Sequence, residues 1–334
     1  MRLRFILIFV LIAALTAGLG CGSSSAPQDN GSTDSGPFHS LMDKIDVARM
    51  MEMVDYMASE QLKGRPTGSP QCSELENYLE ESLREDGLKP VGELGLDNYR
   101  QEFPIPSERC FAENPPPPGQ TVTGVNLLGE IPGESSDEMI ILTANYDGLG
   151  RDAETGSIYP GADYNASGAA AVLELANVLS SADQKPRETL AFVLLGGEEC
   201  GNYGSRALAE SLEAAGLRQA AHIINLEGLG GGNGDYMDAW DLNYKKNRST
   251  VQALDESAAL LDVVLELGGA DPGTSASVFF LYHLPAVTCD WSWFDRGDHP
   301  DFHLPSDTPD KMNRDGLSKV TKVVGLAAWT LANP

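Results

Sequence analysis

Two spacings of apolar residues alternate along the chain, one typical of buried strands and the other of helices. Continuous apolar runs predict strands that are covered on both faces, at 122–131, 139–144, 190–195, 221–226 and 286–289. Between these runs apolar residues recur every three or four positions, which predicts helices at 167–179, 205–215, 250–264 and 317–331. This alternation predicts one α/β domain with a mostly parallel central sheet sandwiched between helices.

The segment before these units has its own pattern. Helical spacing of apolar residues predicts one helix over 39–62 and a second over 72–88, separated by a turn rich in Gly and Pro. Residues 99–105 are typical of an edge strand. The glycine-rich segment 228–234 predicts a flexible loop near the site, because its spacing does not fit a dinucleotide-binding motif and residues 235–243 open no clear helix.

The N-terminus has the features of an export signal. Arg2 and Arg4 precede an apolar stretch of about fifteen residues, which is the length of a signal-peptide core rather than of a membrane span. Gly20 and Cys21 follow, and they resemble a bacterial lipoprotein processing site. We therefore expect a signal peptide over 1–21, a flexible linker over 22–37 and the α/β domain over 38–334. The mature protein is then expected in the bacterial cell envelope, held to a membrane by a lipid on Cys21.

Composition and charge narrow the possible partners. The 334 residues are 42% hydrophobic and 22% charged, which is typical of a globular chain. There are 23 basic and 49 acidic residues, so the net charge is −26 and nucleic acid is not an expected partner. If Cys21 carries lipid, four cysteines remain and permit two disulfide bonds in three pairings, with free buried thiols as the alternative: Cys72, Cys110, Cys200 and Cys289.

Polar residues follow each predicted strand. Glu198 and Glu199 come directly after the strand at 190–195, and Glu227 follows the next strand along the chain. Ligands of open α/β sheets gather at the carboxyl ends of the strands. Two adjacent buried carboxylates need a compensating cation. Since Asn145, Asp147, Asp163 and His303 also lie at predicted strand ends or in loops, an oxygen-rich metal site with one histidine is expected there.

Three motifs carry a resemblance to a known family. They are Gly-Ala-Asp-x-Asn-Ala-Ser-Gly at 161–168, Glu-Glu-x-Gly-x-x-Gly-Ser at 198–205 and His-x-Pro-Ser-Asp-Thr-Pro-Asp-Lys at 303–311. With these motifs the chain resembles metallopeptidase family 28, the co-catalytic zinc aminopeptidases and their relatives, from about residue 64 to the C-terminal helix.

The resemblance implies a role for each site residue. It makes Glu198 the general base and Asp163 a carboxylate that bridges two zinc ions. It assigns Glu199 and His303 to one zinc ion, and Glu227 and the position of Asn145 to the other. Asp147 matches the acid that supports the residue at position 145.

The sequence departs from the family at one half of this site. Asn145 stands where the family has His, Glu227 stands where Asp is commoner, and Tyr164 replaces a frequent second acid. A carboxamide oxygen is a much weaker zinc ligand than imidazole. We therefore expect one zinc ion, held by Asp163, Glu199 and His303, and a second site that is weak or absent. His299 is a candidate replacement ligand.

Three functions follow from this reading. The first is a metal-dependent exopeptidase that acts on a peptide or aminoacyl substrate. The second is a binding protein whose peptidase site has degenerated, and the third is a single-zinc aminoacyl transferase similar to glutaminyl cyclase. Trp293 is a candidate wall of a side-chain pocket.

Overall fold

The computed structural model describes residues 39–110, 116–135, 137–231, 234–243, 245–269, 274–292 and 299–334. The expected signal peptide, the lipidated Cys21, the linker and Trp293 lie outside these ranges. Within them, no helix is both long enough and apolar enough to cross a membrane.

The described residues form one mixed sheet of eight strands in the order β1-β2-β4-β3-β5-β8-β6-β7. The middle of the sheet, from β4 to β8, is parallel as predicted. Antiparallel pairs attach β1, β2 and β6, and β7 pairs parallel with β6. The strands are β1 (Arg100–Pro106), β2 (Thr121–Ile131), β3 (Met139–Asn145), β4 (Thr189–Leu195), β5 (Ala221–Leu226), β6 (Tyr236–Asp241), β7 (Val264–Gly268) and β8 (Ala286–Trp291).

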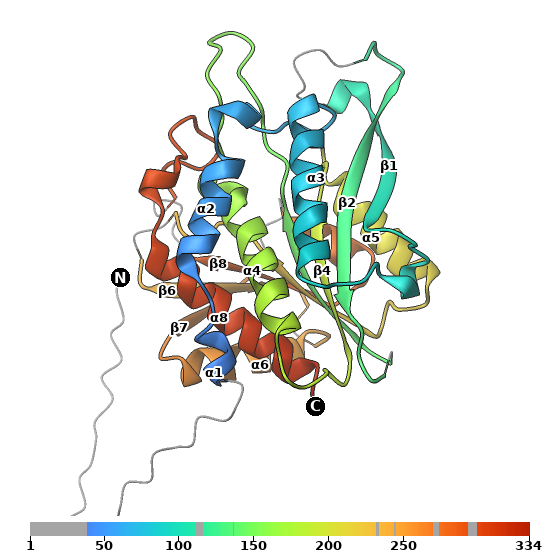
Figure 1. Ribbon diagram of the computed structural model, residues 1–334, viewed down its shortest axis with the longest axis vertical. Helices are drawn as coiled ribbons and strands as arrows, with labels where there is room; N and C mark the ends of the chain where they lie inside the picture. Colours follow the sequence, from blue (N-terminus) through green and yellow to red (C-terminus); the bar gives the residue numbers. More distant parts are fainter. Residues whose placement is uncertain are drawn as a thin grey trace, which may run out of the picture. The chain divides into compact units, whose positions relative to one another are not determined.

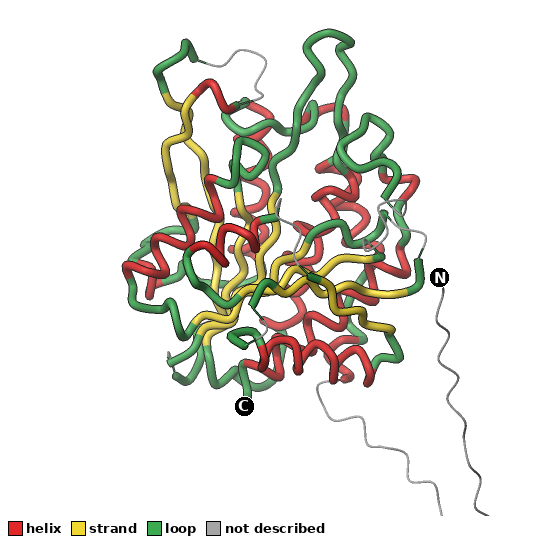
Figure 2. The backbone as a smooth tube through the Cα atoms, turned by 180° about the vertical axis from the view of Figure 1, so that it is seen from behind, coloured by secondary structure: helices red, strands yellow, loops and turns green. Residues whose placement is uncertain are grey.

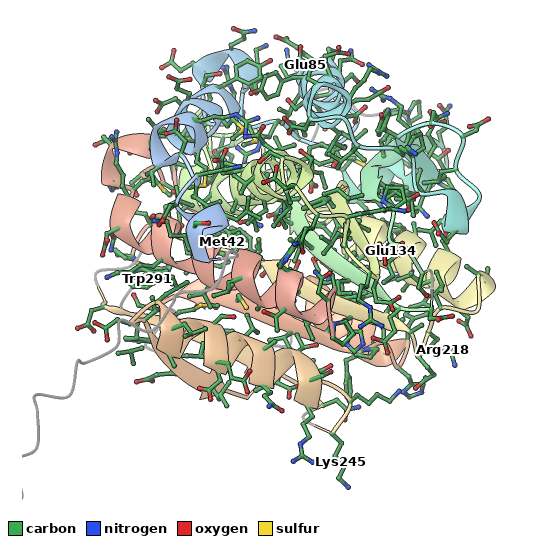
Figure 3. The ribbon with its side chains drawn as sticks, turned by 60° about the horizontal axis from the view of Figure 1, so that its bottom comes forward. Met42, Glu85, Glu134, Arg218, Lys245 and Trp291 are labelled. Carbon is green, nitrogen blue, oxygen red and sulfur yellow. The ribbon has the colours of Figure 1, made fainter. Side chains whose placement is uncertain are left out.

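Helices cover both faces of this sheet (Figures 1 and 2). Alternate residues of β3 and β4 point to opposite faces, and every residue of both strands is buried. One face packs against α1 (His39–Met42), α2 (Val47–Met57), α3 (Pro70–Glu85), α4 (Gly168–Ser180), α6 (Arg248–Leu260) and α8 (Arg314–Leu331). The other face packs against α5 (Tyr203–Ala214) and α7 (Ser275–Leu281). Figure 3 shows the exposed charged side chains of Glu85 and Lys245 at the periphery.

Several predicted elements have different limits. The helix expected over 39–62 is divided into α1, α2 and a short 3₁₀ turn (Glu60–Leu62), because Asp46 caps α2 by accepting the backbone N–H groups of Ala48 and Arg49. The expected helix 250–264 ends at Leu260, and β7 follows it. Residues 235–243, where no helix was expected, contain the strand β6, which pairs with both β7 and β8.

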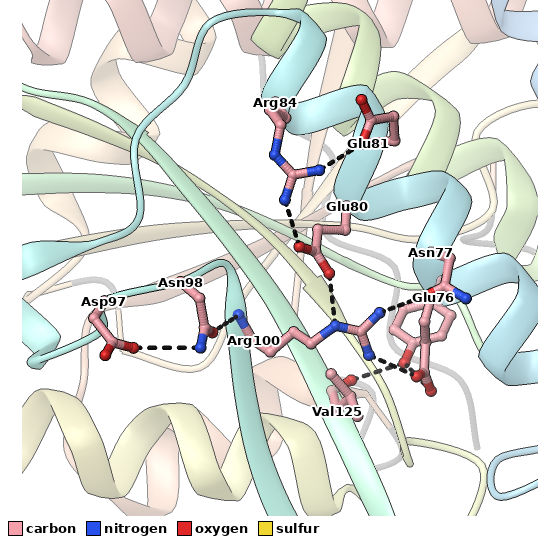
Figure 4. Close-up of polar contacts among 10 residues, drawn as sticks. Glu76, Asn77, Glu80, Glu81, Arg84, Asp97, Asn98, Arg100 and Val125 are labelled. Carbon is pink, nitrogen blue, oxygen red and sulfur yellow. Dashed lines mark hydrogen bonds and ion pairs between the residues drawn. The ribbon is translucent and has the colours of Figure 1, made fainter.

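An arginine fixes the edge strand β1 to the helix layer (Figure 4). The guanidinium of Arg100 donates to Glu80 Oε2 at 2.6 Å, to Glu76 Oε2 at 3.1 Å and to Asn77 Oδ1 at 2.8 Å. Glu76 Oε1 in turn lies 3.2 Å from the hydroxyl of Tyr146, the residue that follows β3. These contacts connect the outer strand to the strand end at which the site begins.

Candidate active site

A cavity of about 250 Å³ lies at the carboxyl ends of β3, β4 and β5. Acidic and aromatic side chains dominate its lining, and none of the described residues that line it is Lys or Arg. No described Lys or Arg side chain in the lining therefore balances the negative charge of the carboxylates. The lining includes Glu198, Glu199, Glu227, Asp290, Tyr164, Trp240, Phe302, His303, Asn145 and Ser275.

Glu198 occupies the turn between β4 and α5 and is buried. Its Oε1 accepts the backbone N–H of Ser205 in the first turn of α5 at 2.7 Å, and its Oε2 accepts the hydroxyl of Ser275 at 2.5 Å. Burial raises the pKa of Glu198 to about 8, although these hydrogen bonds oppose the shift. A carboxyl group with a pKa near the working pH is suited to accept and return a proton.

The turn that carries both glutamates rests on Asp147. The carboxylate of Asp147 is fully buried and accepts the backbone N–H groups of Glu198 and Glu199, each at 3.2 Å. Thr67 donates its hydroxyl to Asp147 Oδ2 at 2.9 Å and accepts the N–H of Gly197. Burial, followed by the charge of Glu199, raises the pKa of Asp147 to about 7. Asp147 therefore positions the glutamate pair through its carboxylate, whereas the family resemblance assigns it to support the residue at position 145.

Arg65 holds the two chain segments that flank the cavity. Its guanidinium is fully buried and donates to the carbonyls of Tyr146 at 2.7 Å and Gly161 at 2.8 Å, and also to that of Pro160. Burial lowers the pKa of Arg65, against the opposing charges of Asp307, Asp147 and Glu199. One side chain thus joins the end of β3 to the loop that precedes α4.

Glu199 and His303 converge on the same part of the cavity. Glu199 Oε1 lies 3.5 Å from His303 Nε2, which is buried and has no hydrogen-bond partner. The imidazole stacks on Phe302, with ring centroids 3.9 Å apart. A buried nitrogen that faces a carboxylate and makes no hydrogen bond fits a metal ligand.

On the opposite side of the cavity, the side-chain oxygens already accept hydrogen bonds from other residues. Asn145 Oδ1 accepts Asn165 Nδ2 at 2.8 Å. Glu227 Oε1 accepts the side-chain amide of Asn225 at 2.7 Å and the N–H of Ser275 at 3.3 Å, and Glu227 Oε2 accepts the hydroxyl of Tyr164 at 3.1 Å. The side-chain oxygens of Asn145 and Glu227, which could bind a metal ion, therefore already accept hydrogen bonds from other residues of the protein.

Asp163 lies away from this cavity. Its carboxylate accepts the backbone N–H of Gly230 at 2.8 Å and lies 2.7 Å from Nδ1 of His299, in a separate small cavity. Tyr164 and Asn165 have non-helical dihedral angles within the turn that precedes α4, and Tyr164 rather than Asp163 faces Glu227 and His303. The expected trio of Asp163, Glu199 and His303 is thus not brought together.

His299 is the ion-pair partner of Asp163 and does not face the glutamates. Its second nitrogen, Nε2, lies 2.7 Å from the carbonyl oxygen of Trp291, so both ring nitrogens face acceptors and the ring carries both protons. Burial opposes this protonation, but the hydrogen bond and charge of Asp163 outweigh it and raise the pKa of His299. The hypothesis that His299 replaces the missing ligand is not supported by this arrangement.

The side chains best suited to hold a metal ion lie on one side of the cavity. In the described ranges, no three His, Cys, Asp or Glu side chains converge closely enough to form a ready metal site. The unpartnered His303 nitrogen, the adjacent Glu199 and the unbalanced acidic lining suit one cation. A second ion would have to displace the hydrogen bonds of Asn145 and Glu227.

The sequence analysis did not single out the lining or supporting residues Arg65, Thr67 and Ser275. Thr67 lies in a turn rich in Gly and Pro, and Ser275 begins the short helix α7, so neither carries a periodic signal. Tyr164 was noticed as a substitution, but spacing alone does not show which of two adjacent side chains enters a cavity. The fact that Tyr164 interrupts an otherwise polar motif was the available signal.

The fold and the cavity define an α/β protein with an acidic site at the carboxyl ends of its parallel strands. Residues 126–328, more than half of the chain, match the sequence profile of Peptidase family M28. The chain belongs to Peptidase family M28.

Relatives and solved structures agree with this assignment. The chain is 34% identical over 116 residues to a probable zinc metalloprotease of Pyrenophora teres f. teres (strain 0-1), which covers 34% of this chain and 23% of that protein. An aminopeptidase from Aneurinibacillus sp. strain AM-1 superposes with a TM-score of 0.69 at 17% identity, covering 89% of this chain and 96% of the other. Porphyromonas gingivalis glutaminyl cyclase gives a TM-score of 0.66 at 17% identity over 85% and 97% of the two chains. The chain thus spans about a quarter of the length of the first of these relatives.

Proposed function

We propose that this protein is a metal-dependent exopeptidase that hydrolyses the terminal amide bond of a small peptide or aminoacyl substrate. The observation that carries the proposal is the buried Glu198, which shares a cavity with the converging pair Glu199 and His303. The family and its zinc metalloprotease relatives support zinc as the metal. Glu199 and His303 are the protein ligands for one ion.

The cavity suits the end of a peptide rather than its middle. At about 250 Å³ it is smaller than a usual ligand pocket, and its carboxyl groups attract a positively charged amino terminus. A bound zinc ion supplies a Lewis acid that polarises the scissile carbonyl and lowers the pKa of water. Glu198 accepts a proton from the attacking water and returns it to the leaving amine. Asp147 holds Glu198 in position through the backbone of the turn.

The test combines metal analysis with a substrate panel. Protein purified without chelators is analysed for metal by mass spectrometry and then assayed with aminoacyl-p-nitroanilides and dipeptides. About one zinc ion per chain together with turnover that a chelator abolishes supports the proposal. Bound zinc without turnover on any substrate contradicts it.

The second candidate is a binding protein without catalysis. The contact between Tyr164 and Glu227 favours it, because protein hydrogen bonds there replace one half of the predicted metal site. In that case a peptide binds with the same affinity to the wild type and to Glu198→Gln, and neither turns it over. Conversion of N-terminal glutamine to pyroglutamate, with no peptide cleavage, would instead support the aminoacyl transferase.

We also propose that the protein is exported and anchored by a lipid on Cys21. Support comes from the basic and apolar N-terminal sequence and from the Gly20–Cys21 pair. Labelled palmitate should be incorporated into the wild type and not into Cys21→Ala. Equal incorporation, or none in either, counts against the anchor.

A further inference from the structure

Cys110 and Cys200 are 90 positions apart in the sequence, yet their sulfur atoms lie 3.7 Å apart. Cys110 follows a 3₁₀ turn (Ser107–Arg109) after β1, and Cys200 directly follows Glu199 in the turn between β4 and α5. We propose that these two cysteines form a disulfide bond that ties the connection after β1 to the turn of the two glutamates. This inference does not rest on the proposed function.

The two sulfurs are close enough for the bond to be considered. They are in van der Waals contact at 3.7 Å, and a disulfide requires them to approach to about 2.05 Å. Both cysteines lie in one small apolar cluster with Ile105 and Val122. Cys110 is partly exposed, whereas Cys200 is buried.

The other two cysteines of the described chain have different surroundings. Cys72 is buried in α3, with its sulfur 3.7 Å from Glu76 Oε1, and Cys289 is buried in β8. Neither sulfur contacts another cysteine sulfur within the described part of the chain. Of the pairings open to four cysteines, the geometry selects a single bond, Cys110–Cys200, and leaves two thiols.

The reaction needs an oxidant, for which a low-molecular-weight disulfide such as oxidised glutathione suffices. The thiolate of Cys110, the more accessible sulfur, attacks one sulfur of the oxidant, which forms a mixed disulfide and releases one thiol. The thiolate of Cys200 then attacks the Cys110 sulfur, which forms the Cys110–Cys200 bond and releases the second thiol. The two protons lost by the cysteines end on the two released thiols.

The bond would hold the glutamate turn from a second side. Asp147 already binds the N–H groups of Glu198 and Glu199, and the N–H groups of Gly201 and Asn202 fold back onto the carbonyl of Glu198. Cys200 lies within this folded turn. A covalent link there restricts the turn in the folded protein. In the unfolded chain it closes a loop between residues 90 positions apart, which lowers the conformational entropy of the unfolded state.

The first test maps the bond directly. The full chain is incubated with oxidised glutathione, its remaining thiols are alkylated under denaturing conditions, and the unreduced digest is analysed by mass spectrometry. We expect one peptide pair joined through Cys110 and Cys200, with Cys72 and Cys289 alkylated. Alkylation of both Cys110 and Cys200, or a glutathione adduct on Cys110 that never resolves, would overturn the proposal.

A second test measures stability with and without the oxidant. Oxidation should raise the Tm of the wild type by roughly 5 °C. Cys110→Ser should abolish this rise. The matched control, Cys289→Ala, loses a buried thiol and should have a lower Tm overall but keep the rise on oxidation. A rise that persists in Cys110→Ser, or no rise in the wild type, contradicts the bond.

Discussion

The hydroxyl of Tyr164 donates a hydrogen bond to Glu227 Oε2 at 3.1 Å and so joins the segment before α4 to the end of β5. Burial, followed by the charge of Glu227, raises the pKa of Tyr164 well above its ordinary value, so the phenol keeps its proton. Glu227 already accepts bonds from Asn225 and Ser275. Glu227 therefore accepts three hydrogen bonds from the protein's own donors.

Restoring ligands on this side should restore a second metal ion. In the double variant Asn145→His with Tyr164→Asp, imidazole and carboxylate groups replace an amide and a phenol beside Glu227. We expect the zinc content to rise from about one to about two ions per chain, measured by mass spectrometry after dialysis. The single variant Tyr164→Phe is the control, since it removes the hydroxyl without adding a ligand and should leave the metal content unchanged. Equal zinc content in the double variant and the wild type would show that these positions do not control the second site.

Asp163 should be required for stability rather than for metal binding. Asp163→Asn leaves the His299 cation buried without its counter-charge, and breaking a buried ion pair of this kind costs about 3–5 kcal/mol. We expect a large decrease in Tm with the zinc content of the folded protein unchanged. His299→Gln should lower Tm in the same way, because it removes the other partner. Loss of zinc from folded Asp163→Asn would show instead that this carboxylate binds the metal ion.

Substitutions of the adjacent residues Glu198 and Glu199 should have different effects, one on catalysis and the other on metal binding. Glu198→Gln removes the proton acceptor, and we expect kcat to fall by about 10²–10⁴ with the zinc content unchanged. Glu199→Gln removes a ligand and should lower the zinc content itself. Parallel measurements of kcat and bound zinc distinguish the two roles. The same loss of zinc in both variants would refute the separation of roles.

Glu130, far along β2, should make stability depend on pH. Burial, followed by the hydrogen bond and charge of Glu93, raises the pKa of Glu130 from 4.5 to about 8. Between these pH values the folded protein holds a proton that the unfolded chain releases, so stability falls as pH rises from about 4.5 to about 8.

The side chain at position 130 cannot ionise in the variant Glu130→Gln, so this variant should not lose stability as the pH rises. Its Tm should be close to that of the wild type at pH 5 and higher by several degrees at pH 8.5, measured by calorimetry. Glu134→Gln, at an exposed position near the end of the same strand, is the matched control and should not change the pH dependence. A wild-type Tm that rises between pH 5 and pH 8 would contradict the assignment.

Much of the central sheet could be predicted because β3, β4 and β5 are buried on both faces, which demands continuous apolar runs. The strands β6 and β7 lacked such runs. β7 lies at the edge of the sheet, where Val264 and Leu267 are exposed, and β6 carries Asp238 and Asp241 within its length. Pairing with distant strands, which local spacing does not encode, made them strands.

The site, like the sheet, has features that the sequence predicts and others that it does not. The turn after β4 was predictable because two glutamates after a buried strand must lie at the edge of the sheet. The orientation of neighbouring side chains was not, since the non-helical dihedral angles of Tyr164 and Asn165 decide whether Asp163 or Tyr164 enters the cavity. A motif in sequence gives the order of its residues and leaves open where each one points.

The contacts of Arg65 set a limit on how this chain can be shortened. The segment that matches the family begins at residue 126, yet Arg65 and Thr67 hold the end of β3 and the carboxylate of Asp147. A fragment trimmed to the matched segment would keep every glutamate and histidine of the cavity and lose both of these supports. The smallest autonomous unit therefore has to start before α3, and fragments or gene fusions that begin at residue 126 should yield protein without an ordered site.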